Sequence, residues 1–322
     1  MLNEMEQRKI MLNVRTFSIL MDTLCKEGML MEAKEVFEVM IQRGIDPDKV
    51  TYNSLIDGYC LQNQMDEAVK TFNMMVEKGC SPNVSSYTIL INEYCKNKKI
   101  DKAKRIFHEM SNKGVIPNVV IYNTLIDGFF KVERPHDALE LFHKMQACGQ
   151  HPNLLTYAIL LDGFCNNRRI AEAMALFLEM EEKKSDHNIV YYNILIDGFC
   201  NVGELTIARE IFSSGLLAKG LQPNVRTYNI MIKGFCKNEL VDEAGELLEE
   251  MDSNGCSPDH HTYNTLIQGL LQHGETLKAV KYLKMMVDKG FSANATTVAM
   301  FIDFLLSNQV DENIQELLPK FE

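Results

Sequence analysis

The chain has 322 residues, a net charge of −11 and 46% hydrophobic residues, so it can bury a continuous core and is not an intrinsically disordered chain. A protein that binds nucleic acid over its whole surface through the phosphates would be basic, so the acidic charge excludes that mode of binding. Phosphates could be bound only by a local basic stripe. No apolar run approaches 18 residues, and the opening MLNEMEQRKIMLN has no apolar signal core. We therefore expect no membrane-spanning helix, and no targeting peptide in this chain.

In chain order, the predicted elements form repeats. The segment YNSLIDGYC begins at Tyr52, YNTLIDGFF at Tyr122 and YNILIDGFC at Tyr192, and weaker copies bring the spacing to 35 residues with one step of 36. Residues 1–13 match the end of a preceding partial repeat. Residues 295–322 form a degenerate C-terminal capping repeat. Between them we predict eight complete repeats: 14–48, 49–83, 84–118, 119–153, 154–188, 189–224, 225–259 and 260–294.

Each repeat is expected to contain two helices. In the second repeat, one apolar face follows helical spacing at Tyr52, Leu55, Ile56, Tyr59 and Cys60, and Thr51 just before it can serve as an N-cap. A second apolar face follows at Met65, Ala68, Val69, Phe72 and Met75. Gly79 suits a helix C′ position, and Pro82 prevents continuation. A lone helix pair cannot bury both faces, so the repeats predict an all-α solenoid of stacked antiparallel helix–turn–helix units, with the first helices on the inner surface.

Nine cysteines suggest a metal site or disulfides, but their spacing argues against both. No CxxC pair exists, and six cysteines share one repeat position on the apolar face of the first helix: Cys25, Cys60, Cys95, Cys165, Cys200 and Cys236. Free cysteine behaves as a small buried hydrophobe, so a structural role is predicted. No HExxH, phosphate-binding loop, dinucleotide fingerprint or GxSxG motif occurs. We expect no metal, no cofactor and no catalytic residue, and hence no enzyme.

The pattern VTYNSLIDGYC…MDEAVKTFNMMVEKGCSPN closely resembles the pentatricopeptide repeat (PPR), and the resemblance covers residues 14–294. Its 35-residue period is similar to the pure P-class, in the style of plant fertility restorers, whereas the tetratricopeptide repeat has a 34-residue period. The resemblance implies a right-handed superhelical α-solenoid that binds single-stranded RNA, one base per repeat. In this family the fifth and last residues of a repeat select the base, and the second residue packs against the face of the base.

Short polar side chains suit base selection, because they can hydrogen-bond a base edge without blocking the next base. Carried over from the family, Ser18 with Asp48 resembles a guanine pair, Thr88 with Asn118 an adenine pair and Asn229 with Asp259 a uracil pair. Four pairs resemble pyrimidine pairs: Asn53 with Asn83, Asn123 with Asn153, Asn193 with Asn224, and Asn264 with Asn294. Ala158 with Asn188 departs from the pattern, because alanine offers no hydrogen bond. The implied target is 5′-GYAYNYUY-3′, where Y is C or U.

Two further positions complete the implied site. At the second position the base-packing residues are Arg15, Val50, Val120, Leu155, Val190 and Arg226. The two arginines depart from the apolar pattern but can stack on a base. Ser85 and His261 also depart from the apolar pattern. At position thirteen a phosphate-contacting lysine is implied at Lys26, Lys96, Lys131 and Lys237. These lysines could equally be helix-end charges with partners four residues away, as in Asp22–Lys26.

The resemblance implies a non-catalytic protein that masks, stabilises or helps to process an organellar transcript, in a mitochondrion or plastid. Single-stranded RNA is the expected partner, other proteins of an RNA-processing complex are further candidates, and a monomer is expected. One alternative is a helical-repeat scaffold that binds peptides, which the −11 charge would favour if the peptides were basic. The other is a truncated, non-functional array. It would fit the partial first repeat and the extra residue near Gly215, around which fraying over 213–219 is expected.

Overall fold

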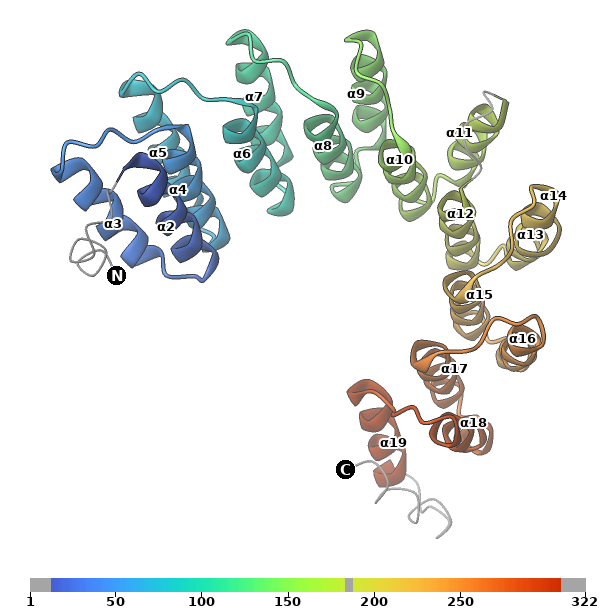
Figure 1. Cartoon of the computed structure of the whole chain (residues 1–322). Coiled ribbons are helices and arrows are strands. Elements are labelled where there is room, and N and C mark those ends of the chain that lie inside the picture. Colours follow the sequence, from blue (N-terminus) through green and yellow to red (C-terminus); the bar gives the residue numbers. More distant parts are fainter. Residues whose placement is uncertain (1–12, 183–187, 308–322) are drawn as a thin grey trace. The chain divides into compact units, whose positions relative to one another are not determined.

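The computed structural model describes residues 13–182 and 188–307, and within these ranges every regular element is helical (Figure 1). Contacts divide the chain into two units, Met1–Gly163 and Phe164–Glu322. Each unit is a stack of antiparallel helix pairs, which confirms the predicted all-α solenoid. The partial repeat before residue 13 and the end of the capping repeat, 308–322, lie outside the described residues. Within the described ranges no helix is long and apolar enough to span a membrane.

In the first unit, the first helices of successive repeats pack against one another, as α2 does against α4 and α4 against α6. These first helices are α2 (Val14–Lys26), α4 (Lys49–Leu61), α6 (Val84–Lys96) and α8 (Val119–Lys131). Their antiparallel partners are α3 (Leu30–Gln42), α5 (Met65–Glu77), α7 (Ile100–Asn112) and α9 (Pro135–Ala147). The next first helix, α10 (Leu154–Asn166), contains the boundary between the two units.

The second unit repeats this arrangement. Its remaining first helices are α12 (Ile189–Val202), α15 (Val225–Lys237), α17 (His260–Gln272) and α19 (Ala295–Ser307). Its second helices are α11 (Ile170–Glu182), α16 (Val241–Ser253) and α18 (Thr276–Asp288), together with a helix built from α13 (Leu205–Glu210), η1 (Ile211–Gly215) and α14 (Leu216–Ala218). The π-helical turn η1 lies in the 36-residue repeat, and one extra residue is what such a turn absorbs. Residues 211–218 are therefore helical, and their fraying stays a prediction for amide exchange.

The first helices begin three residues earlier than the sequence suggested. The N-cap of α4 is Asp48, whose side chain accepts hydrogen bonds from the backbone N–H groups of Val50 and Thr51. Thr51 is thus not the N-cap but the third helical residue, and its hydroxyl closes a capping box with Asp48. Similar boxes begin α6, α15 and α17. The last residue of one repeat is therefore the N-cap of the next.

Aromatic pairs link the second helix of one repeat to the first helix of the next. Phe72 and Tyr87 meet edge to face with ring centroids 5.3 Å apart, and Phe212 and Tyr228 do so at 5.1 Å. Such pairs contribute roughly 0.5–1.5 kcal/mol beyond their burial. Within a repeat, the recurrent alanine of the second helix is completely buried, and its small side chain allows the two helices to approach closely: Ala33, Ala68, Ala103, Ala138, Ala173, Ala208, Ala244 and Ala279.

Five of the six recurrent cysteines, all except Cys60, pack against a glycine of the following repeat. Cys25, Cys60, Cys95, Cys165, Cys200 and Cys236 are all free and buried, as predicted. An added Cβ at Gly234 would lie 2.3 Å from Cys200 Sγ, and one at Gly269 the same distance from Cys236 Sγ. At these two contacts the first helices approach so closely that a Cβ on the glycine would meet the thiol. This notch explains why cysteine and glycine recur together.

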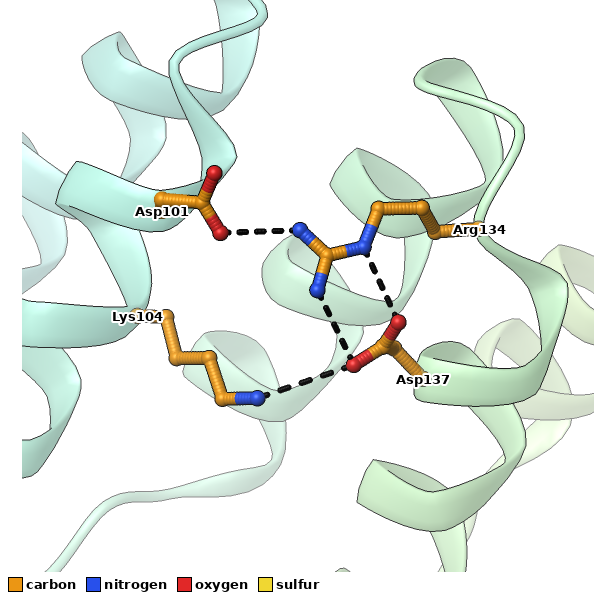
Figure 2. A network of polar contacts seen from close by, with 4 residues as sticks. All are labelled: Asp101, Lys104, Arg134 and Asp137. Carbon is orange, nitrogen blue, oxygen red and sulfur yellow. Dashed lines mark hydrogen bonds and ion pairs between the residues drawn. The ribbon is translucent and has the colours of Figure 1, made fainter.

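A polar network joins the second helices of the third and fourth repeats, as Figure 2 shows. The Arg134 guanidinium donates to Asp101 at 2.8 Å and to Asp137 at 2.9 Å, and Lys104 lies 3.6 Å from Asp137. The Arg134 hydrogen bonds hold the pKa of Asp137 below its ordinary value. All four side chains pair with one another and lie at the junction of two repeats. This network therefore stabilises the stack and is not a binding site.

Candidate nucleic-acid interface

The helix-capping pattern brings the two predicted base-selecting positions together. In several repeats the fifth residue of the first helix lies one turn beyond that helix's own cap and contacts the N-cap of the next first helix. Ser18 Oγ lies 3.5 Å from Asp48 Oδ1 and 2.8 Å from Thr51 Oγ1. Asn53 Nδ2 donates to Asn83 Oδ1 at 3.5 Å. Residues thirty apart in sequence thus form the small polar clusters that the sequence comparison implied.

In the second unit the same contact joins Asn229 to Asp259. Burial alone would raise the pKa of Asp259, but hydrogen bonds from the backbone N–H and hydroxyl of Thr262, and from Asn229, together hold that pKa below its ordinary value. Asp259 is therefore a carboxylate at neutral pH and presents only hydrogen-bond acceptors.

The remaining pairs are less uniform. Thr88 donates its hydroxyl to the Val84 carbonyl at 2.8 Å, while Asn118 caps α8. Asn153 and Asn224 close capping boxes with Thr156 and Thr227. Ala158 and Asn188 belong to different units, and their pairing stays a prediction.

Four of the fifth-position asparagines have a buried amide oxygen with no hydrogen-bond partner in the described part of the chain: Asn53, Asn123, Asn193 and Asn229. The whole side chains of Asn123 and Asn193 are 96% buried, since only 4% of each is exposed. A buried acceptor left unpaired costs roughly 1–3 kcal/mol, so native proteins rarely keep one. Unpaired acceptors thus recur at one position of four repeats.

The second-position residues lie on the surface of the same helices. Val50, Val120 and Leu155 are each more than half exposed, although they are apolar. Arg15 and Arg226 are exposed and Val190 is half-buried. Apolar side chains in open positions of one register suit contact with the face of a flat, apolar group such as a nucleobase.

The position-thirteen lysines are engaged in surface contacts within the protein. Lys26 lies 2.7 Å from Asp22 and Lys131 lies 2.6 Å from Asp127, both with the predicted spacing of four residues. Lys96 pairs with Glu93 at 3.5 Å, and Lys237 Nζ donates to Asn201 Oδ1 at 2.8 Å. The ion-pair interpretation therefore describes the unbound protein. Exposed pairs are worth only about 0–1 kcal/mol, so a phosphate could compete for these lysines.

Sequence reasoning recognised the acidic residue at position nine, four residues before the lysine, only as an ion-pair partner. Asp57 occupies it in α4, where burial raises its pKa above the ordinary value and the nearby Lys96 only partly opposes that rise. The repetition of Asp at this position in Asp22, Asp57, Asp127, Asp162 and Asp197 was the available signal. It keeps the interface close to neutral despite the lysines.

Comparison with known proteins identifies the family. The model of the PPR repeat family matches eight successive segments of the chain: 19–61, 48–96, 83–120, 117–166, 159–201, 187–237, 223–271 and 261–306. The chain belongs to the PPR repeat family.

Among solved structures, this PPR chain is similar to the pentatricopeptide repeat protein PPR10, a maize protein, in complex with an 18-nt psaJ RNA element. The TM-score is 0.74 and the sequence identity 27%, over 94% of this chain and 44% of PPR10. A PPR10 variant with three cysteines replaced by serine, bound to the same element, gives the same values. The chain thus spans less than half the length of these relatives. No curated protein sequence matches it.

Proposed function

We propose that this chain binds single-stranded RNA and selects about one base per repeat. The observation that carries the proposal is the row of buried, unpaired amide oxygens on Asn53, Asn123, Asn193 and Asn229. Uracil and cytosine both present N–H donors on their Watson–Crick edges, and these edges are accessible only in single strands. A pyrimidine at each of these positions would satisfy an acceptor that the protein leaves unpaired.

The other positions of the interface support the same function. The N-cap of the next first helix can supply further hydrogen-bond acceptors beside an unpaired amide, as Asp259 does beside Asn229. The exposed side chains of Val50, Val120 and Leu155 could pack against base faces. PPR10 was solved in complex with RNA, and this chain is similar to it over 94% of its own length. The target we propose is 5′-GYAYNYUY-3′.

The proposal extends to how the protein would act. Occupancy of an RNA segment is enough to mask or stabilise it, or to expose another segment for processing, so no catalytic residue is required. We propose that the chain is not an enzyme and that it binds RNA as a monomer, alone or within an RNA-processing complex. A mitochondrial or plastid transcript is the target that its family resemblance favours.

A titration against fluorescent twelve-nucleotide RNAs tests this proposal. One RNA contains 5′-GCACACUC-3′, which fits the target, and a second has the same bases scrambled. We expect the first to bind at least about tenfold more tightly, the equivalent of one or two satisfied base contacts. Equal, negligible binding to both would contradict RNA binding and would favour the peptide-scaffold hypothesis.

A further inference from the structure

The last complete repeat, 260–294, has the same pair of asparagines as three other repeats but a different hydrogen-bond arrangement. Asn264 Oδ1 accepts from the Asn294 backbone N–H at 3.0 Å and from the Thr297 hydroxyl at 2.7 Å. Asn264 Nδ2 donates to the His260 carbonyl at 2.6 Å. The base-selecting side chain of this repeat is therefore paired on both of its polar atoms, and only 2% of it is exposed.

The cap residue of this pair is engaged as well. Asn294 Oδ1 accepts from the Thr297 backbone N–H at 2.9 Å and from Gln268 Nε2 at 3.2 Å. Gln268 Nε2 also donates to Thr297 Oγ1 at 2.8 Å. Asn264, Gln268, Asn294 and Thr297 thus form one closed network, in which Asn264 offers no unpaired acceptor to a base.

Repeats with an unpaired amide have a different arrangement at the next N-cap. In those repeats the next first helix has a Ser or Thr at its third position, and that hydroxyl donates to the N-cap of the same helix. The pairs are Ser86 to Asn83, Thr156 to Asn153, Thr227 to Asn224 and Thr262 to Asp259. Because that hydroxyl is used in its own capping box, the fifth-position oxygen of the preceding repeat stays unpaired. Thr297 turns its hydroxyl to Asn264 instead, and the capping box is not formed.

Gln268 accounts for the difference. It occupies position nine, where the repeats with an unpaired amide have Asp57, Asp127, Asp197 and Lys233. An ionised aspartate can only accept hydrogen bonds, and Lys233 lies 3.6 Å from Asp197. The Gln268 amide can donate, and by donating to Thr297 Oγ1 it leaves the Thr297 proton directed at Asn264.

We infer that repeat 260–294 does not select a base and that recognition ends with Asn229 and Asp259. This inference rests on the proposed RNA binding and refines it: the eighth base of the proposed target is not selected by Asn264 and Asn294. Asn264 and Asn294 keep the residue types of a pyrimidine pair, but the network makes them structural.

Binding of full-length chain to three twelve-nucleotide RNAs tests the inference. The parent contains 5′-GCACACUC-3′, the second RNA changes its seventh base from U to G, and the third changes its eighth base from C to G. We expect a loss of about tenfold for the seventh base and less than about twofold for the eighth. Comparable losses at both would overturn the inference and keep the proposed function. Absence of binding to every RNA would overturn both.

Two variants then test the role of Gln268. Gln268→Asp removes the donor and restores the residue of the repeats with an unpaired amide, so discrimination at the eighth base should rise to about fivefold or more. Gln272→Asp adds the same charge to the same helix four residues away, outside the network. Because it lies in the register of the phosphate-contacting lysines, it should weaken binding to all three RNAs alike and leave the eighth base unselected. If Gln268→Asp has no more effect than Gln272→Asp, Gln268 is not the cause.

Discussion

The notch between Cys200 and Gly234 gives a sharp prediction about stability. An added Cβ at Gly234 would lie 2.3 Å from Cys200 Sγ and 2.6 Å from Cys200 Cβ. The second contact involves an atom next to the backbone, which cannot swing away as the end of a flexible side chain can. In Gly234→Ala, α12 and α15 must therefore move apart by several tenths of an ångström.

The expected free-energy change follows from two opposing effects. Overpacking a close contact costs about 1–3 kcal/mol, and the contact distances place Gly234→Ala at the upper end. Alanine regains about 1 kcal/mol of helix propensity. The net destabilisation is about 2 kcal/mol. In the control Gly215→Ala the added Cβ has nothing nearer than 3.7 Å, so the same substitution should stabilise its helix by about 0.5–1 kcal/mol.

Amide hydrogen exchange read by mass spectrometry measures both effects locally. In a repeat protein each unit contacts only its neighbours, so Gly234→Ala should lower protection in α12 and α15 by roughly 30-fold and change α2 and α4 little. Cys200→Ala added to Gly234→Ala should recover part of the loss, because it removes the sulfur but keeps Cβ. Equal protection in Gly234→Ala and Gly215→Ala would refute the close-packing argument.

Three further predictions concern single sites. The exposed Cys148 should react with a maleimide well before the buried cysteines, because burial raises the pKa of a thiol such as Cys60 to about 12; mass spectrometry of the modified peptides checks the order. Asn229→Thr combined with Asp259→Asn should move the preference at the seventh nucleotide from U toward A without changing the others, as measured with single-base RNA variants. Asp57→Ala should strengthen RNA binding by about two- to fivefold at pH 7, because it removes a half-buried negative charge from the interface and adds no hydrogen-bond donor. At pH values below the raised pKa of Asp57 the wild type is already neutral there, and titrations should show that the two converge.

Much of the fold was predictable because the repeat shows the same pattern eight times. The apolar spacing from Tyr52 to Cys60 defines one face of a helix in any single copy, and the recurrence of Ala68 and Gly79 fixes where helices meet and end. Gly79 has φ +78°, as a C′ residue should.

The conformation of the turn within a repeat could not be predicted from residue types. The turn between the two helices of a repeat has positive φ at Asn63, Lys98, Glu133, Arg168 and Glu239, none of which is glycine. Tertiary packing of both helices holds these residues in the left-handed region against their intrinsic preference. The signal that could have revealed the turn is the glycine that other repeats place at the same register, as in Gly28 and Gly203.

The base-selecting positions were predictable as positions but not as hydrogen-bonding groups. Asn229 and Asn264 both follow the dipeptide Thr-Tyr at the same position of their repeats. One nevertheless has an unpaired buried oxygen, and the other is fully paired. The difference comes from Gln268 and from Thr297, which belongs to the following repeat, so it arises from contacts between repeats rather than from the pattern within one.

The acidic body of the protein leads to a final prediction, on the salt dependence of RNA binding. With phosphate contact restricted to Lys26, Lys96, Lys131 and Lys237, the logarithm of the binding constant should fall with the logarithm of salt concentration with a slope of about −3, at 0.7 per contacted phosphate. The partners of these lysines, such as Asp22, remain nearby and should make the slope shallower. Titrations at four salt concentrations measure it. A slope steeper than about −5 would mean that further basic residues bind phosphate. Phosphate contacts would then supply most of the binding free energy, and the buried amides a smaller part of it.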